Sequence, residues 1–396
     1  MNGSAPRTRD SAPGISGRQL FAYPFRIFFL SAAFLALFAI PLWLMLLFGA
    51  VSLPTAIPPL FWHQHEMLFG FLSAAIAGFI LTAVCVWTGT ERTHGVRLLL
   101  LWMVWLAGRL LLLFGAGLPP WLVIGVNLAF LPLVALDLLW RIVRGKQWRH
   151  LMLLLVMTLL WLMQLAFLTN LDMRYAYGAL IMAMALISIV GGRITPAFTA
   201  NWLRARGADT GVVNNSQNLA LVTLVTMLLL LAAVILGAAP AAGVLASIAA
   251  VLMLWRLWQW QGWRARGEPL LWILHVSILW VPVALLLLVG HLFLGWPVSA
   301  WTHAAGTGAI GSLILGVMAR VCLGHTGRAL VLPKGMVFAF WAVNLSVLLR
   351  IATGFGWIPM HPGLGSSAML WMLAYGIFLW RYSGILASPR PDGKVG

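Results

Sequence analysis

The sequence has 396 residues, of which 62% are hydrophobic and only 8% are charged, with 22 tryptophans and a mean hydropathy of +0.97. This composition excludes a soluble globular domain and indicates a polytopic membrane protein. We therefore attribute the formal net charge of +17 to membrane topology and attraction to anionic lipid, and not to nucleic-acid binding.

Twelve stretches of the chain are long and apolar enough to cross a bilayer, for which a helix needs about 20 mainly apolar residues. They lie at residues 27–49, 65–87, 97–115, 120–142, 150–169, 175–191, 217–237, 241–261, 270–294, 299–320, 335–355 and 364–382. The predicted fold is thus an all-α membrane protein with one transmembrane domain (27–382), preceded by a polar segment (1–26) and followed by a short tail (383–396). The first 20 residues lack an apolar core, so no cleaved signal peptide is expected.

The positive charges indicate which way the chain crosses the membrane. If the N-terminus is cytoplasmic, 22 of the 25 Lys and Arg residues fall in or beside cytoplasmic loops, where positive residues are retained. The exceptions are Arg109, Arg174 and Arg350, near the outer ends of their spans or in outer loops. Both termini are predicted to be cytoplasmic.

A histidine followed by small residues at equal spacing occurs twice, at the starts of the second and tenth spans. The two copies are His65-x4-Gly70-x3-Ala74-x3-Gly78 and His303-x4-Gly308-x3-Ser312-x3-Gly316. Two imidazoles at matched depth can offer axial nitrogens to one haem iron, and imidazole also suits copper. The alternative is that both histidines cap the starts of their helices at the membrane interface and form hydrogen bonds to loops or water. Gly70, Ala74 and Gly78 lie about 140° around the helix from His65, so they are expected to pack against a neighbouring helix and not against a porphyrin.

Further histidines lie on the same predicted side. A copper site would need two or three imidazoles, and His63, His291 and His361 are available on this side, although His361, followed by Pro362, is expected to be a solvated loop residue. At the cytoplasmic end, Cys85 and Cys322, with Met318 and His325, could form a soft copper site, although small residues in packed helix ends are the simpler interpretation.

The second and tenth spans are eight spans apart, as in a bundle of three four-helix repeats. The sixth span would then be a degenerate third member, since it has no histidine but ends Gly192-Arg193 much as the tenth ends Ala319-Arg320. Haem-copper oxidases share this twelve-helix, pseudo-threefold plan, which is an analogy of architecture alone.

Four motifs carry a resemblance to a known family. They are Tyr23-Pro24-Phe25-Arg26, Trp62-His63-x-His65-Glu66-Met67-Leu68-Phe69-Gly70, Gly192-Arg193-x-x-Pro196-x-Phe198-Thr199, and the long stretch from His303 to Arg328 that includes Leu315-Gly316-Val317-Met318-Ala319-Arg320. Over nearly its whole length the chain resembles the NnrS family. The resemblance implies a bacterial inner-membrane protein that contains haem and copper and acts in the response to nitric oxide.

Carried over to this sequence, the resemblance makes His65 and His303 the first candidates for haem axial ligands, with His63 and His291 next. No Cys-x-x-Cys-His is present, so the haem is expected to be noncovalent and b-type. Arg109 and Arg350 could pair with haem propionates. For Arg109, a structural ion pair with an acidic residue, foremost Glu66, is an equal alternative.

Three functional hypotheses follow. The first is a haem/copper protein that binds, senses or converts nitric oxide, with electrons from quinol or another donor if it is an enzyme. The second is a twelve-helix transporter, although the paired helix interruptions typical of transporters are not evident. The third is an assembly or regulatory partner in the membrane without catalysis.

Overall fold

The computed structural model describes residues 17–394, and in that part of the chain the regular structure is entirely helical. The first half comprises α1 (Gly17–Leu20), α2 (Pro24–Leu47), α3 (Pro59–His65), η1 (Glu66–Phe71), α4 (Leu72–Thr88), α5 (Gly95–Phe114), α6 (Pro120–Arg144), η2 (Trp148–His150), α7 (Leu151–Asn170) and α8 (Met173–Arg204). The second half comprises α9 (Gln217–Ile235), α10 (Ala239–Gln259), η3 (Gly262–Ala265), α11 (Pro269–Leu294), α12 (Val298–His303), η4 (Ala304–Gly311), α13 (Ser312–His325), α14 (Met336–Gly354) and α15 (Met360–Ala387).

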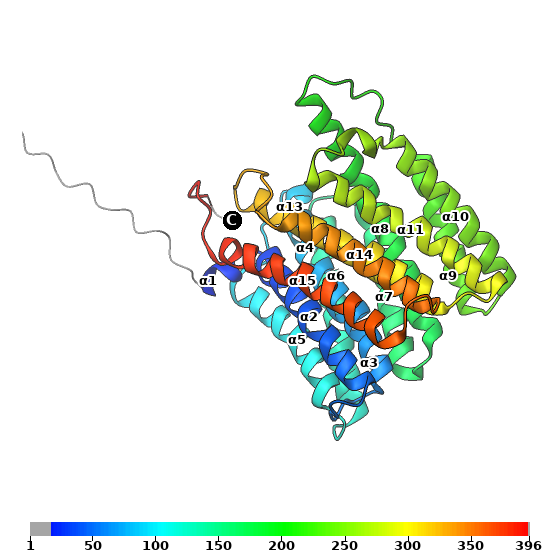
Figure 1. The fold of residues 1–396 in the computed structure, drawn as a ribbon. Helices are drawn as coiled ribbons and strands as arrows, with labels where there is room; N and C mark the ends of the chain where they lie inside the picture. Colours follow the sequence, from blue (N-terminus) through cyan, green and yellow to red (C-terminus); the bar gives the residue numbers. More distant parts are fainter. Residues whose placement is uncertain (1–16, 395–396) are drawn as a thin grey trace, which may run out of the picture.

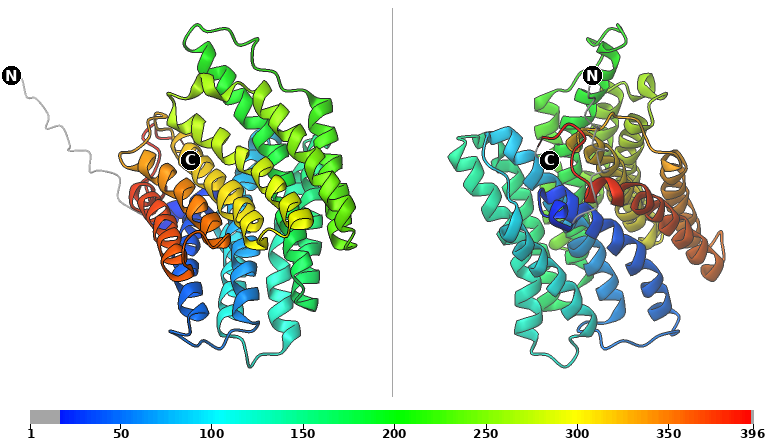
Figure 2. Two further views of the ribbon diagram at one scale, coloured as in Figure 1. Left: turned by 45° about the vertical axis from the view of Figure 1, so that its right-hand side comes forward. Right: turned by 90° about the vertical axis from the view of Figure 1, so that its left-hand side faces the viewer.

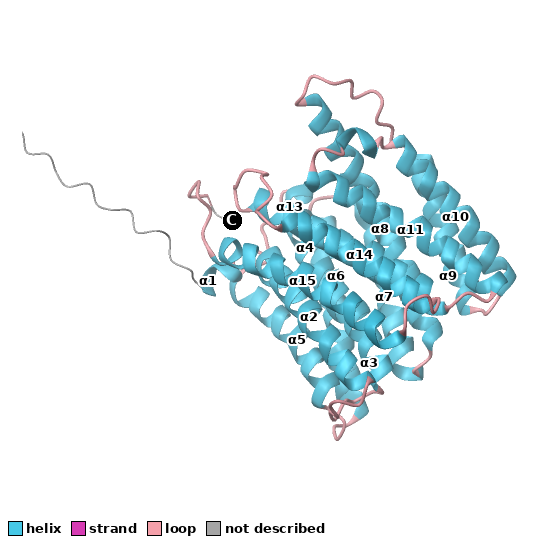
Figure 3. Ribbon diagram, viewed as in Figure 1, coloured by secondary structure: helices cyan, strands magenta, loops and turns pink. Residues whose placement is uncertain are grey.

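The predicted multi-pass fold is confirmed. Within residues 17–394, twelve helical segments are long and apolar enough to cross a membrane, and each corresponds to one predicted span. The connecting loops gather at the two ends of the bundle (Figure 3). Helix α1 packs against α15 at one end, so both ends of the described chain lie on the same side (Figure 1). Residues 1–16 of the predicted N-terminal segment lie outside the described residues.

Two helices are much longer than their predicted spans. Helix α8 covers Met173–Arg204 where the hydropathy predicted 175–191, and α15 covers Met360–Ala387 where it predicted 364–382. Hydropathy locates the apolar part of a helix, but the same helix can continue through polar residues that pack inside the protein, such as Thr195 and Thr199, which are fully buried. Pro196 does not end α8, although it removes one backbone donor.

Three spans form the interior of the bundle. Of the most apolar window in each, 83% is buried in the second span (Pro59–Thr88), 78% in the sixth (Met173–Arg204) and 67% in the tenth (Val298–His325). Most helices consecutive in the chain pack side by side, although α4 packs against α6 and not against α5, and α15 returns to pack against α2 (Figure 2). The three spans that the sequence relates by position are thus the three that contact lipid least.

Both copies of the histidine pattern contain a π-helical segment that begins directly after the histidine. These segments are η1 after His65 and η4 after His303. A π-helical turn shifts the hydrogen-bond register and is frequent at functional sites. Aromatic donors from other helices bind carbonyls there, with Trp105 Nε1 3.0 Å from Gly70 O and Tyr375 Oη 2.8 Å from Gly311 O.

The small residues of both patterns seat neighbouring helices, as predicted. A Cβ added at Gly78 would lie 2.7 Å from Phe29 of α2. A Cβ added at Gly308 would lie 2.7 Å from Cγ and 3.0 Å from Cβ of Trp280 in α11. The preceding span therefore packs directly against the backbone in each copy.

Gly308→Ala is expected to destabilise the protein by about 1–3 kcal/mol, the usual cost of overpacking a core. Trp280 has little freedom to move away, because its Nε1 donates to Asn344 Oδ1 at 2.8 Å. The control is Gly125→Ala in α6, where an added Cβ meets nothing within 4 Å. Thermal unfolding in detergent measures both, and equal midpoints for the two variants would contradict this account of the packing.

Candidate functional site

A cavity of about 330 Å³ lies at the end of the bundle where α3, α8 and α12 begin. The C-terminal half of α2, the end of α14 and the start of α15 complete its wall. Most of the wall is apolar and aromatic, with serine, threonine and other polar side chains distributed along it. Among them are His63, His303 and Arg350, which the sequence analysis selected as candidate ligands.

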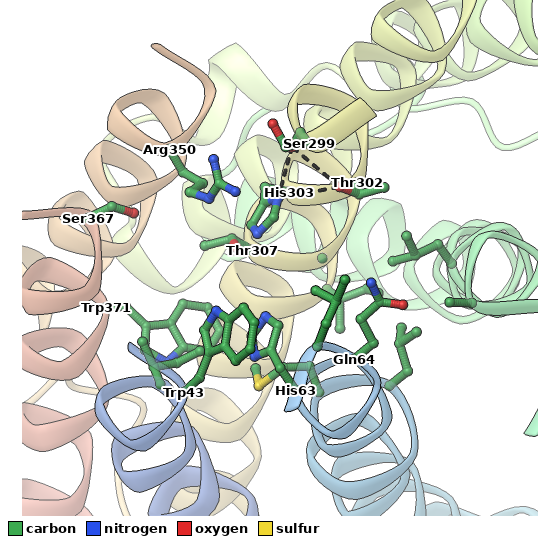
Figure 4. A pocket seen from close by; sticks show the side chains of 18 of the residues that line it. Trp43, His63, Gln64, Ser299, Thr302, His303, Thr307, Arg350, Ser367 and Trp371 are labelled. Atoms are coloured by element: carbon green, nitrogen blue, oxygen red, sulfur yellow. Dashed lines mark hydrogen bonds between the residues drawn. The ribbon is translucent and has the colours of Figure 1, made fainter. Parts of the chain in front are cut away.

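His303 presents one free ring nitrogen to this cavity. Its Nδ1 lies 2.8 Å from the carbonyl oxygen of Ser299, one turn earlier in α12 (Figure 4). A carbonyl only accepts hydrogen bonds, so Nδ1 carries the proton and Nε2 keeps its lone pair. Nε2 has no hydrogen bond to any residue of 17–394. Histidines that bind metals almost always donate the other N–H to a carbonyl or carboxylate, as His303 does here.

His63 is held by stacking instead of by hydrogen bonds. Its ring lies 4.8 Å from that of Trp43 in α2, with the two planes 10° apart (Figure 4). Neither ring nitrogen has a hydrogen-bond partner in the described chain, and Nδ1 is buried. Leaving a buried imidazole nitrogen without a partner costs free energy, so His63 is available to a ligand.

Arg350 is a cation without a counter-ion in the part of the chain that the structure describes. It lies beside His303 in Figure 4, near the C-terminal end of α14. No ion pair or hydrogen bond joins its guanidinium to another described residue, and the nearby wall residues include no carboxylate. An unpaired cation at this depth favours an anionic or strongly accepting ligand.

His65 does not line this cavity. It is fully buried between Glu66 and Gln164, with Nδ1 3.3 Å from Glu66 Oε1 and Nε2 3.1 Å from Gln164 Nε2. The amide nitrogen of Gln164 donates, so Nε2 of His65 accepts and Nδ1 carries the proton. Both ring nitrogens therefore have partners. The predicted pairing of His65 with His303 at one cavity does not occur in the structure.

Arg109 forms the structural ion pair that was one of its two alternatives. Its Nε lies 2.8 Å from Glu66 Oε2, and its Nη2 donates to Asn127 Oδ1 at 2.8 Å. Gln164 Nε2 also donates to the backbone oxygen of Asn127 at 3.1 Å. These residues and His65 form one polar network on α3, η1, α5, α6 and α7, separate from the walls of the cavity. Its one buried polar side-chain atom without a partner is Gln164 Oε1.

The remaining candidates are also outside the cavity. His291 Nδ1 lies 2.8 Å from Trp296 O at the end of α11, and His361 is exposed as predicted but lies in the first turn of α15 and not in a loop. At the opposite end, Cys322 is buried and Cys85 Sγ lies 3.1 Å from Leu81 O. Residues 17–394 contain no group of three His, Cys, Asp or Glu side chains placed to hold a metal ion.

The sequence analysis overlooked Gln164 and Asn127, although a signal for both was present. Each is a polar side chain inside an apolar span, where an unsatisfied group is expensive and a partner is needed. Glu66 and Arg109 needed partners for the same reason. Pairing these four intramembrane residues would have predicted the network that contains His65. Nothing in the sequence indicated that Trp43 stacks on His63.

Comparison with known proteins identifies relatives of the chain. The family model described as NnrS protein matches residues 19–390, which is nearly the whole sequence. The chain belongs to the NnrS family. No curated protein matches the sequence. Membership of the NnrS family indicates a role in the response to nitric oxide for this multi-pass membrane protein.

Breaking the Arg109–Glu66 pair is expected to destabilise this NnrS family member. Arg109→Leu leaves the Glu66 carboxylate buried without its cation, which costs about 3–5 kcal/mol for a buried pair. Thermal unfolding in detergent or nanodiscs measures the loss.

The matched control is Arg174→Leu, which removes an exposed pair with Asp172 at 2.7 Å and is expected to cost at most about 1 kcal/mol. An Arg109 variant as stable as this control would contradict the structural role of the pair.

Proposed function

We propose that this protein acts in the nitric oxide response by binding nitric oxide at a metal centre that His63 and His303 hold in the cavity. The observation that carries the proposal is the pair of imidazoles with free nitrogens at one apolar cavity, beside a guanidinium without a counter-ion. Our proposal takes His63 in place of His65, because the nitrogens of His65 already have partners.

The residues at the cavity fit a haem. Two imidazoles are suitable ligands for haem iron, and Arg350 can pair with a propionate in the bidentate geometry that guanidinium favours. Aromatic walls such as Trp43 and Trp371 provide flat apolar surface. The volume of about 330 Å³ is at the lower end of cofactor pockets, about 300–1,000 Å³, so a bound macrocycle would contact the walls closely.

Copper alone fits the same donors less well. Two imidazoles could bind it, but the Arg350 guanidinium repels a bare cation and no described carboxylate in the wall offsets that repulsion. A haem supplies its own carboxylates. The charge of Arg350 therefore favours haem b at this cavity, and metal analysis of the purified protein distinguishes the two.

The protein's own residues position and protect such a centre. The hydrogen bond to the Ser299 carbonyl keeps the proton of His303 on Nδ1 and so leaves Nε2 free toward the cavity. Stacking on Trp43 fixes the plane of the His63 ring. The apolar wall excludes water. A haem bound there would supply one-electron chemistry and, if one of the two imidazoles left the iron, a position for a diatomic ligand.

The predicted topology places this cavity near the periplasmic side of a bacterial inner membrane. Nitric oxide is small and neutral, so it can reach the cavity from the bilayer without a polar channel. Conversion of nitric oxide, as distinct from binding, would need an electron donor such as quinol. Turnover of nitric oxide with a quinol analogue tests that step separately from metal binding.

The protein purified from haem-replete cells is expected to show a Soret band and bound iron. His303→Ala and His63→Ala are expected to lose most of the band, because each removes a ligand nitrogen. His291→Ala is the matched control, since that histidine lies at the same end of the bundle but outside the cavity, and it should keep the spectrum.

Two outcomes would contradict this assignment. Loss of the band in His65→Ala with retention in His63→Ala would return the ligand role to His65. Colourless, metal-free protein would favour a transporter or a non-catalytic membrane partner.

Arg350→Ala is expected to weaken haem retention by about ten- to a hundredfold, since a charge-assisted hydrogen bond contributes about 1.5–3 kcal/mol. Arg350→Lys keeps the charge and should lose less. Haem transfer to apomyoglobin measures the rate, with Arg174→Ala as the control at the same end of the bundle. Equal transfer rates for Arg350→Ala and the control would show that Arg350 does not hold the cofactor.

A further inference from the structure

A second, smaller cavity of about 80 Å³ lies between the interior spans and is partly open to the outside of the bundle, since wall residues such as Phe79 and Val190 are partly exposed. Its lining comes from α2, α4, α8 and α13, and every lining side chain is a hydrocarbon or a thioether. Representative wall residues are Ile76 on α4, Val190 on α8 and Val317 on α13. The backbone groups around it belong to helices and are engaged in their own hydrogen bonds.

The two cavities follow one another along the same three spans. Phe71 lines the first cavity and Leu72 the second. In the tenth span, Ile310 lines the first and Leu313 the second, which is a rise of about 4.5 Å along a helix. In the sixth span Leu180 lines the first and Leu186 the second, which is a rise of about 9 Å. The second cavity therefore lies within about two helical turns of the first, on the side toward the interior of the bundle.

Equivalent positions of the two histidine patterns line this second cavity. Ile76 and Ile314 each lie 11 residues after the histidine of their own copy, and Phe79 and Val317 each lie 14 residues after it. The same faces of the second and tenth spans thus meet here, and the wall that they form is apolar in both copies.

Water is a poor occupant of such a space. A bound water needs two to four polar partners, and no side chain of this wall offers one. Enclosed apolar cavities stay dry and take up apolar molecules such as xenon, and an apolar wall of this composition favours the same class of molecule. A water molecule occupies about 30 Å³ in the liquid, so there is room for a molecule of only a few atoms.

We propose that this cavity binds small, uncharged, apolar molecules of the size of a diatomic gas and holds them within about two helical turns of the first cavity. Occupancy by such a molecule does not depend on the proposed function. Its use as a local store of nitric oxide for the metal centre does rest on that function.

Xenon is the probe for occupancy. Under xenon pressure, crystals of the full-length protein are expected to show one anomalous peak between α4, α8 and α13. Absence of a peak there, or density for a lipid or detergent acyl chain in its place, would overturn the proposal.

Filling variants test the site in solution by xenon-129 NMR. Val317→Phe and Val190→Phe each add ring atoms from a different wall, and each is expected to weaken xenon binding at least tenfold. Two variants are used because either one could fold poorly. Val251→Phe is the matched control, since that valine is 64% exposed on the lipid-facing side of α10, and it should bind xenon as the unmodified protein does. If both Val317→Phe and Val190→Phe fold and bind xenon as the unmodified protein does, the assignment of the binding site is wrong.

A kinetic arm separates this inference from the proposed function. If the protein contains haem, flash photolysis of its nitric oxide complex is expected to show a smaller slow geminate phase in Val317→Phe than in Val251→Phe. Xenon binding without bound metal would reject the metal centre but keep the apolar site. Bound haem without xenon binding would do the reverse.

Discussion

The structure depends on one constraint of the bilayer, which is that a buried polar group has to find its partner inside the protein. His65, Glu66, Arg109, Asn127 and Gln164 bind one another, and of the side-chain polar atoms in this network only Gln164 Oε1 is buried without a partner. The constraint is not met at the cavity, where two imidazoles and a guanidinium face apolar walls. A hydrogen-bonded network of this kind stabilises the fold, whereas the cavity brings two imidazoles and a guanidinium together around space that a further molecule can fill.

Hydropathy and charge were sufficient to predict the membrane-spanning architecture, because length in hydrocarbon is a property of local sequence. All twelve spans were found, but the polar extension of α8 to Arg204 was not, since hydropathy detects lipid contact and not helix continuity. The predicted orientation of the termini relative to the membrane stays a prediction. The packing role of the small residues was predictable as well, because Gly78 and Gly308 leave room for nothing except a neighbouring helix.

The candidate site was predictable in its components but not in its arrangement. His63 and His65 are two residues apart, so only one of them can face a given cavity from the helix that ends at His65. The sequence contains the residues that decide between the two histidines, since Glu66 and Gln164 bind the two ring nitrogens of His65. This information is distributed over several helices, however, and can be used only when it is known which faces of these helices contact one another. The π-helical turns after His65 and His303 were not predicted either, because they depend on donors such as Trp105 and Tyr375 from distant parts of the chain.

The π-helical segments also explain how two nearly equivalent spans can serve different purposes. Each begins after a histidine and changes the helical phase, so the residues beyond it meet at the apolar cavity in both copies. Before the turn, the two spans differ. His303 lines the first cavity, whereas the corresponding His65 belongs to the polar network. His63 lines the first cavity in place of His65. The second and tenth spans are thus equivalent where they contribute only apolar packing. They differ where their polar side chains have different hydrogen-bond partners. A sequence repeat alone therefore could not identify which histidines share a site.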